Sequence, residues 1–332
     1  MGQFAKRDGA FAMQTTPIDV IDYDANGYDY REYWSGRDYE LWAEQRVLRR
    51  LVPKLGRPAW FADFGGAFGR NAGHYLPRAA HAVIMDYSAT NLRNAGERHA
   101  AEVATGRLHL VRADLYRIPF RDFAFDAGMV VRVLHHLSDV NRGLTEMSRT
   151  VGSRWLLDVP IKHHVLGLAR GLRSGQLREV RSPDPVAMGV EEQFWNFRLG
   201  AVRERLGDLG WRTSLGASVN NFRQWEKVAP RANRLARPFV HGMEVVAQTW
   251  GKGWWGPSQF VVARRHDPAQ PAYDRPGGHT ADLPPELAGL ARRVVCPVCM
   301  TRLNWTLDTA TCIRCDHTYH RHGAFWDFVP PL

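Results

Sequence analysis

Long hydrophobic runs are missing from this sequence. Its 332 residues are 45% hydrophobic and 23% charged, yet no apolar stretch approaches the roughly 20 residues that a membrane-spanning helix needs. The first residues, MGQFAKRDGAFAMQTTPIDV, lack the apolar core of a secretory signal. Lys6 stands where a myristoylation signal carries Ser or Thr. We therefore expect a cytoplasmic protein of ordinary globular composition without a membrane span.

Compact clusters of basic residues and internal repeats are also missing. The chain nevertheless carries 44 Lys and Arg against 34 Asp and Glu, a net charge of +10. A basic balance favours polyanionic partners such as RNA. The basic residues are dispersed, however, which fits a protein that is simply rich in arginine. Cysteine is scarce, and all four cysteines lie between residues 296 and 315, so the residues before them have none with which to form a disulfide.

Short apolar runs alternate with helical segments through most of the chain. This alternation predicts an α/β, Rossmann-like fold: a seven-stranded, mostly parallel sheet with helices on both faces. We expect strands at 59–64, 81–86, 108–113, 126–131, 154–159, 212–219 and 258–264. Helices are expected near 28–52, 69–78, 89–103, 139–150, 191–208 and 229–250. The helix at 191–208 would pack on the sheet through the stripe Trp195, Leu199, Val202, Leu206 and Leu209.

Composition divides the chain further. Residues 1–27 show little periodicity, and we expect 1–55 to form an N-terminal arm and a lid helix. The sheet domain would occupy 56–264. A stretch at 265–288 that is rich in Pro, Asp and Gly is typical of a linker. The remaining residues, 289–332, hold the cysteines and would form a small C-terminal β zinc ribbon.

The stretch FADFGGAFGRNAGHY places three glycines directly after an apolar run and before a helical segment. Glycines let the backbone approach a ligand, and a helix N-terminus offers free N–H groups, so this turn predicts a nucleotide site. The dinucleotide-binding pattern G-x-G-x-x-G fails here at two of its three glycines. The pattern Asp/Glu-x-Gly-x-Gly-x-Gly fits Asp63, Gly65 and Gly69, while Ala67 replaces its middle glycine, with Gly66 beside it.

Two further acids follow apolar runs. Asp86 ends VIMD and Asp114 follows LHLVRA, and the segment FRDFAFDAGMVVRVLHHLSD comes next. This order resembles the class I S-adenosylmethionine (SAM) methyltransferases, in particular the small-molecule type that includes the ubiquinone and menaquinone enzymes. The resemblance covers about residues 30–264. Taken alone, each acid could also be a helix N-cap after a strand.

The resemblance implies a SAM site and assigns residues to it. Asp63 would hold the glycine loop or, through water, the ammonium group of SAM. Asp86 would accept hydrogen bonds from the ribose hydroxyls, and Asp114 would bind the adenine amino group. The implied cofactor-binding residues are Asp63, Gly65, Gly66, Gly69, Asp86, Tyr87, Asp114, Leu115 (which would flank the adenine ring) and Arg132.

Histidine pairs are the candidates for a general base, which would help if the methyl acceptor is an oxygen. His163 and His164 follow the fifth expected strand, and acceptor sites of this fold lie over the carboxyl ends of the strands. His136, beside His135, is the other candidate. Either pair could instead consist of polar residues at a loop edge.

Aromatic residues gather just before the first expected strand, in YWSGRDYE. In related enzymes such a segment folds over the cofactor as a lid. Tyr33, Trp34, Arg37 and Tyr39 are therefore candidate contacts with SAM. The alternative is an aromatic helix that packs on the edge of the sheet.

The spacing C-x2-C-x12-C-x2-C joins Cys296, Cys299, Cys312 and Cys315 into two knuckles. Four thiolates in this pattern predict a tetrahedral Zn²⁺ site with Zn–S distances of about 2.3 Å. All four ligands come from protein, so the site would be structural. A disulfide or redox pair is the competing interpretation, which a cytosolic setting disfavours. The following YHRHGAFWDFVP resembles the end of short zinc-ribbon proteins that partner tRNA and protein methyltransferases.

Together these features predict a SAM-dependent methyltransferase with a C-terminal zinc ribbon. We expect a small or lipid-like acceptor. RNA, favoured by the basic charge and the ribbon, is the alternative acceptor, and a protein acceptor is another. A non-catalytic scaffold that binds a protein partner through the ribbon is an alternative of a different class, because Ala67 departs from the glycine pattern.

Overall fold

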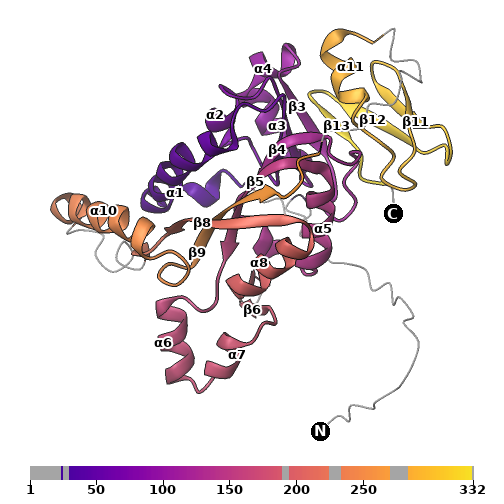
Figure 1. Ribbon diagram of the computed structural model, residues 1–332. Coiled ribbons are helices and arrows are strands. Elements are labelled where there is room, and N and C mark those ends of the chain that lie inside the picture. The colour runs from indigo at the N-terminus through magenta and orange to yellow at the C-terminus, as the bar shows by residue number, and fades with distance from the viewer. Residues whose placement is uncertain (1–23, 25–29, 189–193, 224–232, 270–282, 331–332) are drawn as a thin grey trace, which may run out of the picture.

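The computed structural model of the chain describes residue 24 and residues 30–188, 194–223, 233–269 and 283–330. Its centre is a twisted sheet with helices on both faces (Figure 1). The predicted fold class is confirmed, and all seven predicted strands are present. They are β1 (Trp60–Phe64), β2 (His81–Asp86), β3 (Leu108–Arg112), β4 (Phe125–Val130), β5 (Val151–Pro160), β8 (Trp211–Val219) and β9 (Ser258–Arg265).

These strands lie in the order β3-β2-β1-β4-β5-β9-β8. The first five are parallel, and β9 runs antiparallel to both β5 and β8. The strand order reverses between β1 and β4, so a crevice forms at their carboxyl ends, where open α/β sheets bind ligands. Asp63 and Ile84 are register partners here, as are Asp86 and Arg112.

Side chains alternate between two cores along β1. Trp60, Ala62 and Phe64 belong to the core that α5 and α8 cover, and Phe61 belongs to the core that α1 and α3 cover. The helices are α1 (Asp38–Leu51), α2 (Ala72–Tyr75), α3 (Ala89–Arg98), α4 (Ala100–Ala104), α5 (Val140–Thr150), α6 (Val165–Arg173), α7 (Leu177–Arg181), α8 (Leu199–Asp208), α10 (Asn233–Trp250) and α11 (Pro285–Ala291). Short 3-10 turns are η1 (Glu32–Trp34), η2 (Val52–Leu55) and η3 (Leu134–His136).

Several predicted helices have different bounds in the structure. The one predicted at 69–78 is only the four-residue α2, and the one predicted at 89–103 breaks into α3 and α4 at His99. The helix predicted at 191–208 begins at Leu199, because Trp195 lies in the strand β7 (Phe194–Asn196). Leu199, Val202 and Leu206 do pack on the sheet as predicted. The start of the helix predicted at 229–250 and most of the predicted arm, 1–27, lie outside the described residues.

An insertion that the sequence did not reveal follows β5. It contains α6, α7 and a hairpin of β6 (Val186–Met188) with β7. The hairpin stays close to the main sheet, since Ile161 and Phe197 form a β-bridge. Figure 1 shows α6 and α7 projecting from the lower side of the sheet domain.

The C-terminal segment forms four short antiparallel strands, β10 (Leu303–Trp305), β11 (Thr309–Cys312), β12 (Thr318–His322) and β13 (Phe325–Asp327). The last of these pairs in parallel with β3, so the sheet continues through the segment (yellow in Figure 1). Asp327 accepts a hydrogen bond from Arg112 at 2.9 Å. The predicted ribbon is therefore attached to the edge of the main sheet by backbone pairing.

Candidate cofactor pocket and metal centre

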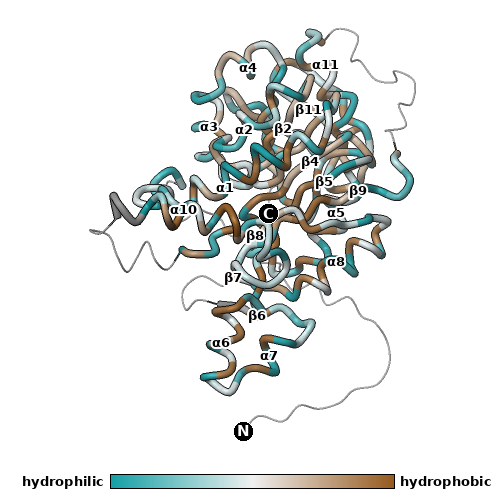
Figure 2. Tube along the Cα trace, turned by 60° about the vertical axis from the view of Figure 1, so that its left-hand side comes forward, coloured by the Kyte–Doolittle hydropathy of each residue, from teal (hydrophilic) through white to brown (hydrophobic). Residues whose placement is uncertain are grey.

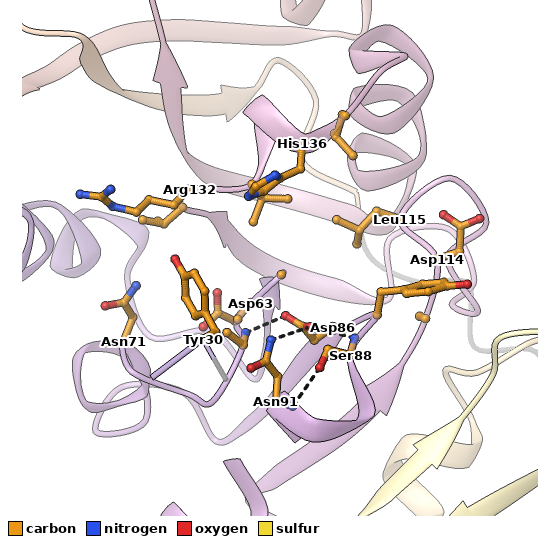
Figure 3. A pocket seen from close by; sticks show the side chains of 18 of the residues that line it. Tyr30, Asp63, Asn71, Asp86, Ser88, Asn91, Asp114, Leu115, Arg132 and His136 are labelled. Carbon is orange, nitrogen blue, oxygen red and sulfur yellow. Dashed lines mark hydrogen bonds between the residues drawn. The ribbon is translucent and has the colours of Figure 1, made fainter. Parts of the chain in front are cut away.

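A pocket opens at the carboxyl ends of β1, β2, β3 and β4 (Figure 3). It encloses about 960 Å³, including space open to solvent. It brings together nine predicted residues: Asp63, Gly65, Gly66, Asp86, Tyr87, Asp114, Leu115, Arg132 and His136. Gly69, His163 and His164 are not among its lining residues. Eleven lining residues were not predicted: Tyr30, Ala67, Arg70, Asn71, Ser88, Asn91, Ala113, Tyr116, Val131, Val133 and Leu137.

The glycine loop is held against the end of β2. The N–H groups of Gly65 and Gly66 both donate to the Met85 carbonyl, at 2.7 and 3.2 Å. Gly65 has a φ of 66°, and a Cβ there would meet Val133 at 2.3 Å, so only glycine fits. Gly69 supports the turn from outside the pocket: its φ is 71°, and a Cβ would meet the His99 ring at 2.8 Å.

Ala67 stands in place of the middle glycine and adopts a backbone conformation that favours glycine. Its φ is 47°, in the left-handed region that side chains disfavour. Its N–H donates to Asp86 Oδ2 at 2.8 Å. The side chain packs in a small cluster with Trp34 and Phe68. The loop therefore reaches the glycine-like conformation with an alanine, and it is tied to the acid that ends β2.

Asp63 is almost completely buried, with 2% of its surface exposed. Burial raises the pKa of its carboxyl to about 7, although the nearby Tyr75 hydroxyl and the Arg70 guanidinium act in the opposite direction. Within the described residues, Asp63 Oδ2 and Arg70 Nη1 are buried polar atoms without a hydrogen-bond partner. Both residues line the pocket, so it contains an unsatisfied acceptor and an unsatisfied donor suited to a zwitterionic ligand.

The two other predicted acids lie along the same wall of the pocket. Asp86 accepts through Oδ1 from Ser88 N at 3.0 Å and Asn91 Nδ2 at 3.3 Å. Asp114 accepts from Tyr116 N at 2.8 Å. Burial raises the pKa of both carboxyls above the usual value. A carboxylate has about four acceptor positions. The bonds from Ala67, Ser88 and Asn91 leave Asp86 about one position for a ligand, on Oδ2, and Asp114 keeps more.

Arg132 points towards α1 rather than into the open pocket (Figure 3). Its guanidinium donates to Glu44 at 2.6 Å and to Glu40 at 3.2 Å. Glu44 also pairs with Arg70 at 2.5 Å. Burial alone would raise the pKa of Glu44, but Arg70 and Arg132 hold it below the usual value. One buried carboxylate thus fixes two arginines of the pocket wall.

An aromatic segment covers one side of the glycine loop. Tyr30 lines the pocket and stacks on Tyr33 at a centroid distance of 5.3 Å, while Arg70 lies 3.8 Å from the centre of the Trp34 ring. Tyr39, in contrast, donates to Glu244 of α10 at 2.6 Å. The predicted lid contacts Tyr33, Trp34, Arg37 and Tyr39 do not line the pocket, whereas Tyr30, which was not predicted, does.

The histidine pairs occupy two different environments. His136 lies on η3, lines the pocket, and has its ring centre 5.4 Å from that of Phe194. His164 precedes α6, and neither it nor His163 lines the pocket. Burial lowers the pKa of both His136 and His164 to about 4. Both rings are therefore neutral at neutral pH and are weak bases.

The four cysteines converge as their spacing predicts. Their sulfur atoms lie within 4.8 Å of one another, and three of the pairs are 3.4–3.6 Å apart. A tetrahedron with 2.3 Å metal–sulfur bonds has edges of about 3.8 Å. No pair is joined as a disulfide. The arrangement can hold a metal ion with four thiolate ligands, as the spacing predicts.

Comparison with known proteins agrees with this geometry. Residues 62–153 match the methyltransferase domain family, and the match spans β1 to the start of β5, including the glycine loop, Asp86 and Asp114. The chain thus contains a methyltransferase domain, as its sequence predicts. No part of the match falls in the cysteine segment. None of the described helices is long and apolar enough to cross a membrane.

Individual curated relatives share less than 30% sequence identity with this chain over the matched residues. An uncharacterised protein of Synechococcus is 29% identical over 153 residues, which is 42% of this chain and 35% of that protein. A demethylmenaquinone methyltransferase of Thermobifida fusca is 27% identical over 45% of this chain and 67% of the enzyme. For most of the curated relatives the match spans about half of their length. Among solved structures, magnesium protoporphyrin IX methyltransferase of Synechocystis with bound SAH is 14% identical, with a TM-score of 0.46 over 73% of this chain and 95% of that one.

Proposed function

We propose that this protein binds SAM in the pocket at the ends of β1–β4 and transfers its methyl group to a small or lipid-like acceptor. One observation carries the proposal: Asp63, Asp86 and Asp114, from three successive strand ends, line a single pocket beside a glycine loop. The match of residues 62–153 to a methyltransferase domain supports the same function.

The amino-acid end of SAM would lie against the glycine loop. Asp63 Oδ2 would accept from the ammonium group, and Arg70 Nη1 would donate to the carboxylate. Both atoms are buried without a partner among the described residues, and a charge-assisted hydrogen bond to each is favoured strongly in such a setting. Binding would also lower the pKa of Asp63, because a cation would then face its carboxylate.

The nucleoside end would extend along β2 and β3. Asp86 would accept from a ribose hydroxyl at the position that is left on Oδ2, while it keeps its bond from Ala67 N. Asp114 would accept from the adenine amino group, and Leu115 would cover the ring. Gly66 and Tyr87 would complete the wall, and Arg132 would act by fixing α1 and the lid rather than by touching the cofactor.

Bound SAM supplies an electrophilic methyl group that is displaced in line. The protein's task is then to hold the acceptor near that methyl group and to exclude water. Leu137 and Val133 give the pocket an apolar wall beside His136. His136 would orient an acceptor through its neutral ring. With pKa values near 4, His136 and His164 contribute little as proton acceptors, so proximity would be the main source of rate.

We also propose that the four cysteines hold a structural Zn²⁺. Their tetrahedral spacing supports the assignment, and no position remains for a substrate. The ion would stabilise a segment whose own core is small, because metal binding and folding are coupled in such modules.

An RNA acceptor is the second candidate. The consecutive residues His320, Arg321 and His322 are exposed on β12, on the ribbon. Arginine on an exposed strand can contact phosphates, and such binding weakens steeply as salt rises. RNA affinity that does not change with salt would discard this candidate.

Isothermal titration calorimetry with SAM tests the main proposal. We expect binding in the micromolar range, weakened at least tenfold by Asp86→Ala, because the ribose would lose its acceptor. Asp208→Ala, at an exposed position on α8, is the matched control and should bind as the wild type does. An unchanged affinity of Asp86→Ala removes Asp86 from the site. Preferential binding of a nicotinamide dinucleotide would overturn the proposal.

A further inference from the structure

Helix α10 exposes its apolar face and buries its polar one. Phe239, Val246 and Trp250 lie on one side of the helix, at spacings of seven and four, and are 64%, 58% and 80% exposed. On the opposite side Glu244 and Gln248 are buried. These two residues bond to Tyr39 and Asn221 and to the Ala43 carbonyl. The orientation of α10 is thus fixed by buried hydrogen bonds that direct its apolar stripe to solvent.

A second exposed apolar surface adjoins the end of α10. Trp254 is about half exposed, and its carbonyl accepts from Val165 N at 2.9 Å, at the first turn of α6. On α6, Leu166 and Leu172 are also exposed. Figure 1 shows α10 projecting to the left of the domain and α6 projecting below it, and Figure 2 shows hydrophobic stretches along both.

The charge around these side chains is strongly basic. On α6 and α7 the charged residues are Arg170, Arg173, Arg178 and Arg181, all exposed, with one acid, Glu179. From Arg237 to Gly256 the charged residues are Arg237, Lys252 and the buried Glu244. An exposed apolar stripe with Trp at its end and arginines beside it is the composition of helices that lie in the interface of an anionic bilayer.

We propose that α10, the Trp250–Trp254 turn and α6 form a docking surface for anionic lipid membranes. Phe239, Val246 and Trp250 would enter the headgroup region, and the arginines of α6 and α7 would contact lipid phosphates. The surface lies near the acceptor side of the pocket: α6 follows β5, and Phe194 of the same insertion contacts His136, which lines the pocket.

The docking surface rests on the proposed function in one respect: its use would be to bring a lipid-like acceptor from the bilayer to the pocket. Membrane binding itself needs neither SAM nor turnover. If SAM binding were absent and vesicle binding present, the proposed function alone would fail. If SAM bound and vesicles did not, the docking surface alone would fail.

Vesicle co-sedimentation of the full chain tests the surface. Vesicles of phosphatidylcholine are compared with vesicles that also contain phosphatidylglycerol. We expect binding to the anionic vesicles only, reduced by salt. Phe239→Ser with Trp250→Ser should lower the partition coefficient at least about tenfold, because large apolar side chains no longer enter the interface. Replacing Arg170 and Arg173 with Gln should lower it about tenfold, since each basic residue near an anionic surface adds to binding.

The matched control is Leu307→Ser with Ile313→Ser, which removes similarly exposed apolar side chains from the ribbon. It should leave vesicle binding unchanged. Unfolding temperature and SAM affinity are measured for every variant and should match the wild type, because all altered residues are exposed and outside the pocket. Absence of vesicle binding, or equal loss in the control, overturns the proposal. Analytical ultracentrifugation that finds a dimer dissociated by Trp250→Ser overturns it too, since a second copy would then cover the surface.

Discussion

The side chain of Glu44 contributes both to the stability of the fold and to the positions of two arginines in the pocket wall. It is 1% exposed and lies between Arg70 and Arg132, whose side chains are each 11% exposed. Glu44→Gln keeps the shape but removes the charge, leaving two buried guanidinium groups with a neutral partner. Breaking a buried ion pair by changing one partner costs about 3–5 kcal/mol. Because glutamine still accepts a hydrogen bond, we expect a loss of about 3 kcal/mol at neutral pH.

Urea unfolding followed by circular dichroism measures this loss. The pH dependence adds a second check. The pKa of Glu44 is lowered in the folded state, so its contribution is complete above the unfolded value of 4.5 and is lost as the pH falls below it. The wild type and Glu44→Gln should therefore converge in acid. Glu97→Gln, at an exposed position on α3, should stay within about 0.5 kcal/mol of the wild type. A Glu44→Gln loss as small as that of this control, at neutral pH, would refute the reasoning.

Three further predictions concern the loop, the pocket and the metal centre. Ala67→Gly relieves a left-handed alanine at φ 47° and should raise the free energy of unfolding by about 0.5 kcal/mol, the strain relieved less the entropy cost of glycine; a loss of stability in urea would contradict this. SAM affinity should fall about tenfold from about pH 8 to about pH 6, because the proposed ammonium contact needs an ionised Asp63, whose pKa is about 7. Calorimetry of Asp63→Asn should give an affinity that does not change with pH. A similar fall in that variant would exclude Asp63 as the cause. Metal removal by a chelator, or Cys312→Ser, should lower the unfolding temperature of the whole sheet domain, because β13 continues that sheet; calorimetry that finds the main transition unmoved would show that the ribbon unfolds by itself.

The sheet and the acids at its strand ends could be predicted because their signals are local. Strands such as β2 are buried on both faces, and they read as continuous apolar runs in the sequence. Asp63, at the end of the run before the glycine loop, and Asp86 follow directly from that pattern. The cysteine spacing is equally local, and it fixes four sulfur atoms without any long-range contact.

The features that sequence did not reveal depend on distant partners. Nothing near Glu44 in the sequence shows that it pairs with Arg70 and Arg132. The apolar spacing around Trp195 fits a helix, and it does not reveal that Trp195 lies in β7, which forms a hairpin with β6. The insertion at α6 and α7 is rich in arginine and glycine, so it carries no buried stripe to predict from. The pairing of β13 with β3 joins two strands that are far apart in the sequence. Each strand has an apolar pattern of its own, and neither pattern indicates the other strand as its neighbour.

The pairing of β13 with β3 also constrains how the protein is made. Arg112 and Asp327 are 215 residues apart, so at about 5–20 residues per second the ribosome completes β13 roughly ten to forty seconds after β3. During that interval the outer edge of β3, an apolar strand, has no neighbour and can pair with other nascent chains. If the cysteines bind a metal ion as we propose, a shortage of that ion in the cell would prolong this exposure. Newly synthesised protein should then accumulate in inclusion bodies, while protein assembled earlier stays dispersed.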